Sequence, residues 1–372
     1  MKTIHLLGLI HLLLLIGGRC ALAQGELTPA GPPAPMMKTL QQIEPRTDVQ
    51  RLAGNSTCLF EISQPGSYYL TANLVGTSNK RGIEIAADNV TLDLNGFEVR
   101  GVPDSWQGVY VAGYHENISL RNGTLCQWGT SGVEAGQASR SLFTDLRVSA
   151  NRGAGLTVGS GCFAQNCVIR SNRTYGILAQ YGCSIRDCVS EWNGLEGINT
   201  GYAALVRGCQ VRNNGADGIG VSWRSTVADT VSCSNMLVGI RVAGCSIVKD
   251  CIVSTNRAEG ILVSEYCRVI GNVCDRNNYG IRASGLGNRI EENHTARNVT
   301  RGFKVDRVDG CNVIVKNSAY NTLGRVGDYN YEIASGNWFG PVILPSGLAV
   351  GLGATHPFNH PWANFGDPSP IQ

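Results

Sequence analysis

The chain has 372 residues and carries 31 basic against 28 acidic side chains, a net charge of +3. This small excess gives no indication of a nucleic-acid partner or of binding to an anionic membrane surface. Glycine is abundant at 47 residues, and only 16% of the residues are charged, a composition that suits short strands joined by tight turns.

Residues 1–23 have the features of a secretory signal peptide. Lys2 gives a positive start, residues 6–16 form an apolar run, and an Ala-Leu-Ala cleavage sequence follows at 21–23. The apolar run is too short to cross a bilayer of about 30 Å, and no other apolar run reaches the roughly 18 residues that a membrane span needs. We therefore expect an exported protein, periplasmic or extracellular, with no membrane span and a mature chain that begins at Gln24.

Residues 24–57 are expected to form a leader and an N-terminal cap. Several prolines keep the start extended, and apolar residues at helical spacing follow over 36–43. A cap here would cover the exposed edge of the first strands. A tail without fixed structure is the alternative.

From Cys58 onward the sequence becomes strand-like, with apolar residues alternating over 90–94. From residue 151 it also repeats with a fixed period, because asparagine recurs eight times at intervals of 21 residues and glycine follows each asparagine after three or four residues. A fixed period of this length is typical of repeat architectures. The eight positions are Asn151, Asn172, Asn193, Asn214, Asn235, Asn256, Asn277 and Asn298.

One repeat, residues 176–196, predicts three short strands, at 176–179, at 183–185 and from 188, separated by turns. No proline occurs between Pro103 and Pro341, as a continuous parallel sheet requires. We predict an all-β fold, a three-sided parallel β-helix of about ten coils over residues 58–320. Its handedness should be right, as in nearly all parallel crossovers.

The asparagine row is expected to be structural. Asparagine tolerates a positive φ at a tight turn, and stacked side-chain amides can hydrogen-bond from coil to coil. Cysteines also recur at equivalent positions, which predicts thiols stacked inside the solenoid as small buried residues. Disulfides between coils are the alternative. These cysteines are Cys162 and Cys183 in one row, and Cys167, Cys188, Cys209 and Cys251 in another.

Residues 321–372 lack the period and combine aromatic residues with several prolines. We expect a C-terminal cap that folds these aromatic residues over the last coil, followed by a tail. A separate binding segment is the alternative.

Three aromatic residues, Tyr181, Tyr202 and Trp223, occupy the fifth position after the repeat glycine in consecutive coils. They should form an exposed row with a spacing of about 4.8 Å per coil. Sugar rings stack on such faces, so the row is a candidate carbohydrate-binding site. The alternative is that the rings only stabilise one another.

A second row is charged and contains Asp187, Arg207, Asp229, Lys249 and Asp250. It is a candidate acid/base or ion-binding row, with exposed salt bridges of little energetic value as the alternative. No metal site or other cofactor is expected. Calcium would enter only if the protein is a polysaccharide lyase, whose chemistry needs clustered acids with an arginine or lysine as base.

The coil pattern from Cys58 to Asn317 resembles the pectate-lyase-like right-handed parallel β-helix superfamily. Four segments also resemble a group of exported bacterial β-helix repeat proteins without an assigned function, namely residues 37–47, 65–70, 89–96 and 362–365. The superfamily resemblance implies the fold. It also implies a function among lyases, pectin hydrolases, uronan epimerases, phage tailspikes and adhesin-like surface proteins, without selecting one.

Two enzyme motifs of that superfamily are absent from the sequence, the Gly-His-Gly of the hydrolases and the Asp-Pro-His of the epimerases. We therefore expect an exported protein that presents an extended surface to polysaccharide or another extracellular polymer. The first alternative is a polysaccharide lyase or a related carbohydrate-active enzyme. The second is a non-catalytic, adhesin-like structural protein.

Overall fold

The computed structural model describes residues 46–320, 329–344, 349–350 and 361–366. The chain divides into two units, Met1–Pro45 and Arg46–Gln372, and all described residues belong to the second. The expected signal peptide and residues 24–45 of the expected leader lie outside the described residues, as does much of the expected C-terminal cap.

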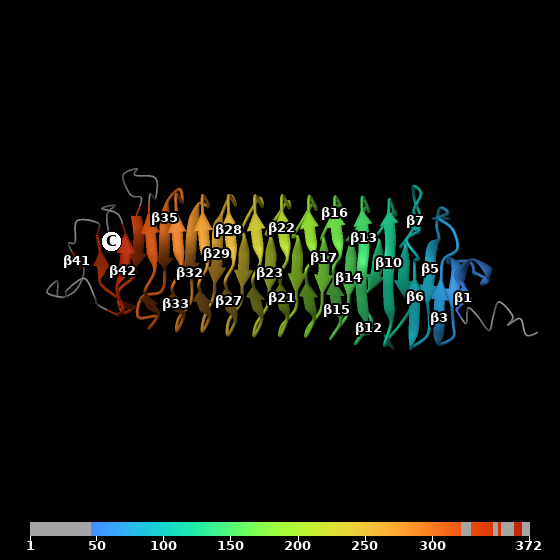
Figure 1. Ribbon diagram of the computed structural model, residues 1–372, viewed down its shortest axis with the longest axis horizontal. Helices are drawn as coiled ribbons and strands as arrows, with labels where there is room; N and C mark the ends of the chain where they lie inside the picture. Colours follow the sequence, from blue (N-terminus) through green and yellow to red (C-terminus); the bar gives the residue numbers. More distant parts are fainter. Residues whose placement is uncertain (1–45, 321–328, 345–348, 351–360, 367–372) are drawn as a thin grey trace, which may run out of the picture. The chain divides into compact units, whose positions relative to one another are not determined.

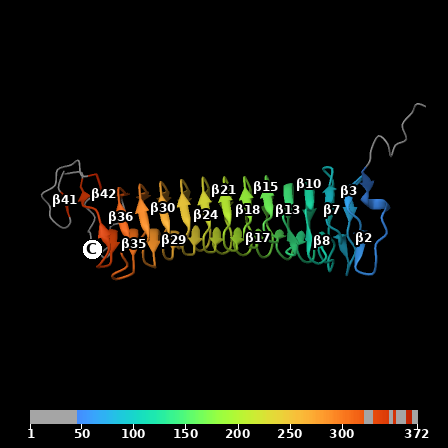
Figure 2. The same ribbon diagram turned by 90° about the horizontal axis from the view of Figure 1, so that it is seen from below.

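Each coil of the second unit contains three short strands, as the repeat predicts. In one coil these are β17 (Ile177–Ala179), β18 (Ser184–Arg186) and β19 (Val189–Glu191). Each pairs in parallel with the strand 21 residues later, so that Ile177 lies opposite Ile198. Figures 1 and 2 show the resulting stack of coils from two directions. The predicted three-sided parallel β-helix is confirmed.

The first face of the solenoid is a parallel sheet of 13 strands, which indicates at least thirteen coils in the described residues rather than about ten. Coils before residue 151 are longer than 21 residues, with Ile83 opposite Val109 and Val109 opposite Val133, so the period does not reveal them. The 13 strands are β2 (Cys58–Ile62), β5 (Arg81–Ile85), β8 (Val109–Val111), β11 (Val133–Ala135), β14 (Leu156–Val158), β17, β20 (Ile198–Thr200), β23 (Ile219–Val221), β26 (Ile240–Val242), β29 (Glu259–Val263), β32 (Tyr279–Ala283), β35 (Arg301–Val305) and β38 (Tyr329–Ile333).

The second and third faces are built in the same way from the other two strands of each coil. The second face contains β1 (Thr47–Asp48), β3 (Gly66–Tyr69), β6 (Val90–Asp93), β15 (Phe163–Gln165), β18, β21 (Leu205–Arg207), β24 (Thr226–Ala228), β27 (Ile247–Lys249), β30 (Arg268–Ile270), β33 (Arg289–Glu291), β36 (Val313–Val315) and β39 (Trp338–Phe339). The third contains β4 (Leu74–Val75), β7 (Glu98–Arg100), β16 (Val168–Arg170), β19, β22 (Gln210–Arg212), β25 (Val231–Cys233), β28 (Ile252–Ser254), β31 (Val273–Asp275), β34 (His294–Ala296), β37 (Ser318–Tyr320) and β42 (Asn364–Gly366).

A few elements depart from this scheme. The long strands β10 (Ser119–Cys126) and β13 (Leu142–Ser149) run across both the second and third faces. The short strands β9 (His115–Glu116) and β12 (Ala138–Ser139) pair with each other, and β40 (Val342–Ile343) pairs with β42 and with β41 (Ala349–Val350). Among the described residues the helical content is η1 (Val49–Arg51), so no helix in this part of the chain could span a membrane.

The eight repeat asparagines form a buried ladder, which confirms their structural role. The amide Nδ2 of each of the first seven donates to Oδ1 of the asparagine in the next coil, over 2.9 to 3.4 Å. The backbone N–H of each donor donates to the same Oδ1, for example from Asn214 to Asn235 at 3.1 Å. Every rung therefore satisfies polar groups that would otherwise be costly to bury.

The expected positive φ at these asparagines is wrong. The left-handed residue is the one before each asparagine, such as Trp192 (φ 57°), Asn213 (φ 55°) and Thr255 (φ 56°). Its backbone N–H donates to a carbonyl of the next coil, as Thr255 does to Asp275 at 2.9 Å. The asparagine itself is then free to turn its amide inward to the ladder.

The stacked cysteines occupy the inner corners at the other two turns, and all six are buried as expected. The thirteen cysteines among the described residues are free thiols. The Sγ of Cys188 donates to the carbonyl of Arg186 at 3.1 Å, and burial raises the pKa of Cys162 to about 11 and that of Cys251 to about 12. Further along the chain, asparagines take over the same corners as two additional ladders, Asn272, Asn293, Asn317 and Asn364, and Asn288, Asn312 and Asn337.

Candidate functional site

The second face presents two columns of outward side chains. In each three-residue strand of the repeat the middle residue points into the solenoid, as Ile185 and Val206 do, and the first and third point outward. Parallel pairing places equivalent outward residues on adjacent rungs, so that Arg186 lies beside Arg207. This face therefore carries continuous rows of side chains along the solenoid.

The predicted aromatic row lies at the turn that leads into the second face. We call Tyr181, Tyr202 and Trp223 the aromatic ridge; their exposed fractions are 49%, 52% and 45%. The rings of Tyr181 and Tyr202 are stacked, with centroids 5.1 Å apart and an interplanar angle of 7°. The third ring leans toward the following coil, where a Cβ on Gly244 would lie only 2.6 Å from Cζ3 of Trp223. The ridge thus contains one stacked pair of rings and a third ring whose position requires a glycine at residue 244.

The predicted charged row lies on the same face and at the turn that leaves it. The Nε of Arg207 donates to Asp229 at 2.8 Å, whereas the side chains of Arg186 and Lys249 form no ion pair with any described residue. No group of three or more His, Cys, Asp or Glu in the described part of the chain could hold a metal ion. The residues of this row are therefore neighbours along one edge but do not converge on a single point.

Two hollows of similar construction lie along this row. The first, about 390 Å³, is lined by Arg186, Asp187, Arg207, Gly208 and Asp229. The second, about 540 Å³, includes in its lining Lys249, Asp250, Arg268, Gly271 and Glu292. In each, a glycine with a φ of 66° or 67° separates acidic residues one coil before and one coil after it. Each hollow exists because the glycine on the middle rung, Gly208 or Gly271, has no side chain to fill it.

A larger cleft of about 760 Å³ lies at the C-terminal end of the second face. Its lining includes Arg289, Val313, Trp338, Phe339 and Trp362. Trp338, Phe339 and Trp362 belong to the segment 321–372, which the sequence predicts to be a C-terminal cap, because they lie beyond the periodic region. The only signal in the sequence is the 21-residue interval between Arg268 and Arg289, which places both on adjacent rungs of the second face.

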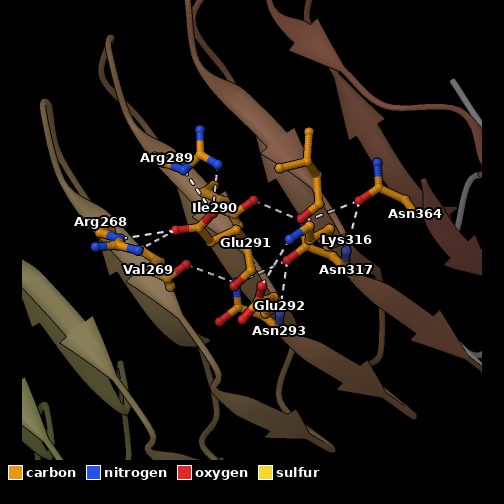
Figure 3. Close-up of polar contacts among 11 residues, drawn as sticks. Arg268, Val269, Arg289, Ile290, Glu291, Glu292, Asn293, Lys316, Asn317 and Asn364 are labelled. Atoms are coloured by element: carbon orange, nitrogen blue, oxygen red, sulfur yellow. Dashed lines mark hydrogen bonds and ion pairs between the residues drawn. The ribbon is translucent and has the colours of Figure 1, made fainter. Parts of the chain in front are cut away.

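A buried carboxylate, that of Glu291, holds Arg289 of the cleft lining in place (Figure 3). Glu291 accepts hydrogen bonds from Arg268 and Arg289, with N–O distances of 2.7 Å to each, and its side chain is only 6% exposed. The hydrogen bond from Arg289 is the main cause that lowers the pKa of Glu291, with a further contribution from Arg268. Both guanidinium groups are therefore held in fixed positions by an ionised acid.

Comparison with known proteins bears on the fold. A family model described as a right-handed β-helix region matches residues 81–235. The A-module of mannuronan C-5 epimerase AlgE6 from Azotobacter vinelandii is similar over 86% of this chain and 88% of that one, with 15% identity and a TM-score of 0.52. Lower TM-scores of 0.47 and 0.36 relate the chain to the Dettilon tailspike protein gp208 (14% identity, 84% of this chain and 60% of that one) and to pectate lyase Pel9A (17% identity, 69% of each).

No curated protein sequence matches the chain. At these identities the structural similarity concerns the fold and does not assign an activity. The family match and the similarity to the AlgE6 module agree with the structure on a right-handed parallel β-helix fold.

Proposed function

We propose that this protein is an exported, non-catalytic β-helix that binds an extended polysaccharide along its second face. The observation that carries the proposal is the stacked, exposed pair Tyr181 and Tyr202 beside a row of hollows on the same face. A polymer lying along the solenoid would meet a new rung about every 4.8 Å. Export rests on the sequence of residues 1–23.

The chemistry of this face suits hydroxyl-rich chains. The aromatic ridge is about half exposed and offers apolar surface to the C–H groups of a sugar, and the side chains of Arg186 and Lys249 have donors available for its hydroxyl groups. Hydrogen bonds to charged groups contribute about 1.5–3 kcal/mol each. The AlgE6 module is named as an enzyme of mannuronan, a polysaccharide, which supports a polysaccharide partner at the level of the fold.

Binding of the full chain to a panel of neutral and uronate polysaccharides tests the proposal, with Tyr202→Ala as the main variant. Loss of one stacking partner should weaken binding roughly two- to tenfold, the equivalent of about 0.5–1.5 kcal/mol. Trp192→Ala is the matched control, because Trp192 is equally exposed but follows the third face. A chain that binds no polysaccharide, or binding that Tyr202→Ala leaves unchanged, would reject the proposal and favour an adhesin-like structural role.

One observation favours a second candidate, polysaccharide lyase activity. Lys249 has no ion-pair partner among the described residues and lines a hollow with Asp250, so its side chain, when it is a neutral amine, is placed to accept the proton beside a uronate carboxylate. Ultraviolet absorbance of unsaturated products, measured on uronate polymers with and without calcium, tests this activity. Product that disappears in Lys249→Ala would establish the lyase; no product under either condition would exclude it for those polymers.

A further inference from the structure

The cleft at the C-terminal end of the second face is distinct from the aromatic ridge and from the two hollows. Its volume of about 760 Å³ lies within the range of roughly 300–1,000 Å³ that is typical of small-ligand sites. Trp338 and Trp362 remain 71% and 47% exposed, and the lining of the cleft also includes the apolar side chains of Val313 and Phe339. Exposed aromatic surface of this kind commonly marks a binding site.

Both tryptophans lie close in sequence to asparagines of the inner ladders. Trp338 follows Asn337, whose Oδ1 accepts from Nδ2 of Asn312 at 2.8 Å. Trp362 lies two residues before Asn364, which accepts from Asn317 at 3.2 Å (Figure 3). Asn364 also donates to the carbonyl of Gly340 at 3.0 Å. The backbone that carries each exposed ring is thus anchored in the core, so the cleft exists before any ligand arrives.

The indole of Trp362 is also held by cations. The guanidinium carbon of Arg289 lies 5.9 Å from a ring centroid of Trp362, and Nζ of Lys316 lies 6.0 Å from it. Both distances lie near the limit of about 6 Å for a cation–π contact.

Each cation near the ring of Trp362 has a carboxylate partner within the protein. Arg289 is bound to Glu291 at 2.7 Å, and Lys316 to Glu292 at 3.3 Å. An anionic guest would have to share Arg289 with the ionised carboxylate of Glu291, which lies directly behind it. A neutral guest needs only the N–H groups of Arg289 that Glu291 leaves free, since a guanidinium has five.

We propose that this cleft is a sugar subsite that takes one neutral pyranose unit, stacked on Trp362 and Trp338 and hydrogen-bonded to Arg289. This inference rests on the proposed function and adds the class of sugar and the place where one unit is held. The lining contains two tryptophans, a proline and a phenylalanine, which suit the apolar face of a pyranose ring. Hydrogen bonds from the guanidinium of Arg289 would fix the orientation of the sugar.

Isothermal titration of the full chain with cellohexaose, xylohexaose, maltohexaose and oligogalacturonate, each at low and high salt, tests the proposal. At least one neutral oligosaccharide should bind with an affinity that salt leaves unchanged, because no net charge is neutralised. Trp362→Ala and Trp338→Ala should each weaken it roughly tenfold or more, and Trp362→Phe should retain most of the affinity. Trp192→Ala is the control and should bind as the wild type does.

Three results would overturn the inference: no neutral oligosaccharide binds, oligogalacturonate binds more tightly with a strong salt dependence, or the variants Trp362→Ala and Trp338→Ala bind normally. Melting curves of the variants separate loss of the site from loss of the fold. Tyr202→Ala distinguishes the two proposals, since it should weaken long polymers and spare hexasaccharides. Polymer binding that depends on Tyr202 but not on Trp362 would reject the subsite and leave the proposed function standing.

Discussion

At the scale of single residues, the left-handed position before each ladder asparagine is the most demanding place in the coil. Residues of six types occupy it, Ala, Ser, Trp, Asn, Thr and Arg, and all have φ between 51° and 57°. A left-handed conformation costs an ordinary L-residue about 1–2 kcal/mol, and asparagine tolerates it best among residues other than glycine. Replacing a poorly suited residue at this position by asparagine should therefore stabilise the folded protein.

Thr255→Asn should raise the free energy of unfolding by about 0.5–1 kcal/mol, because threonine is β-branched and its φ is 56°. The hydrogen bonds of its exposed hydroxyl to Ser254 and Ser234 contribute little. The reciprocal change, Asn213→Thr, tests the equivalent position of another coil, where φ is 55°, and should destabilise by a similar amount. Denaturant unfolding measures both, and changes of the same sign would contradict the explanation.

The asparagine ladder shows what the sequence can and cannot establish about residues. An interval of 21 predicts that Asn193 lies next to Asn214, and the side-chain chemistry of asparagine predicts the hydrogen bond between them. The left-handed residue could not be identified, because Trp192 and Thr255 carry no chemical mark of that conformation. At this position the positive φ is required by backbone pairing with the next coil and not by the side chain.

At the scale of the elements, the inner corners of the coils determine how the cysteines behave. Cys162, Cys183 and Cys251 lie in buried columns, and burial raises the pKa of each thiol, so thiolate is scarce at neutral pH. Cys245 and Cys311 lie at exposed turns. The coils thus contain two classes of thiol: buried thiols that react slowly, and exposed thiols that reagents can reach.

Iodoacetamide at pH 8 should label Cys245 and Cys311 first in the folded protein, with the buried columns labelled only after unfolding. Peptide mass spectrometry with a time course measures the order. Peptides that join Cys167 to Cys188 without reduction would contradict free thiols and favour the disulfide alternative. Labelling in denaturant is the control for total thiol content.

The strand β33 contains a carboxylate whose charge stabilises the fold near the end cleft. The hydrogen bond from Arg289 lowers the pKa of Glu291 from 4.5, so the folded state favours the ionised form more than the unfolded state does. The stability that this pair contributes is therefore present above about pH 4.5 and is lost as the pH falls through the lower pKa of the folded state.

Glu291→Gln should lower the melting temperature at pH 7, and the difference from the wild type should shrink as the pH falls below 4.5. Melting curves between pH 7 and pH 3 measure it. Glu292→Gln is the matched control, because its side chain is exposed and its one ion pair with a described residue is with Lys316 at 3.3 Å; its effect should be small throughout. A difference for Glu291→Gln that stays constant with pH would contradict the assignment.

Whether a candidate site could be predicted from the sequence depends on the strands that carry it. The aromatic ridge could be predicted, because Tyr181, Tyr202 and Trp223 share one phase of the repeat. The end cleft could not, because β39 and β42 pair with strands at irregular distances, with Phe365 opposite Ser318. Periodicity carries information only where each coil has the same length.

At the scale of the solenoid, each coil contacts mainly the coil before and the coil after it, so the stack should tolerate the loss of one whole unit. Removing residues 198–218 joins Gly197 to Ile219 and places Asn193 beside Asn235. Inward residues remain compatible, since Ile185 would then face Val227. The ladder and the core would close over the deletion without a change of register.

This 21-residue deletion should fold into a β-helix with one coil fewer, with the circular dichroism of the wild type. Its denaturant m value should fall by roughly one thirteenth, because m scales with the surface exposed on unfolding and the first face counts 13 strands. Removing residues 198–208 is the control. It deletes about half a coil, so every later asparagine leaves its corner and inward residues turn outward. A half-coil deletion as stable as the whole-coil deletion would show that the register of the ladder does not determine the fold.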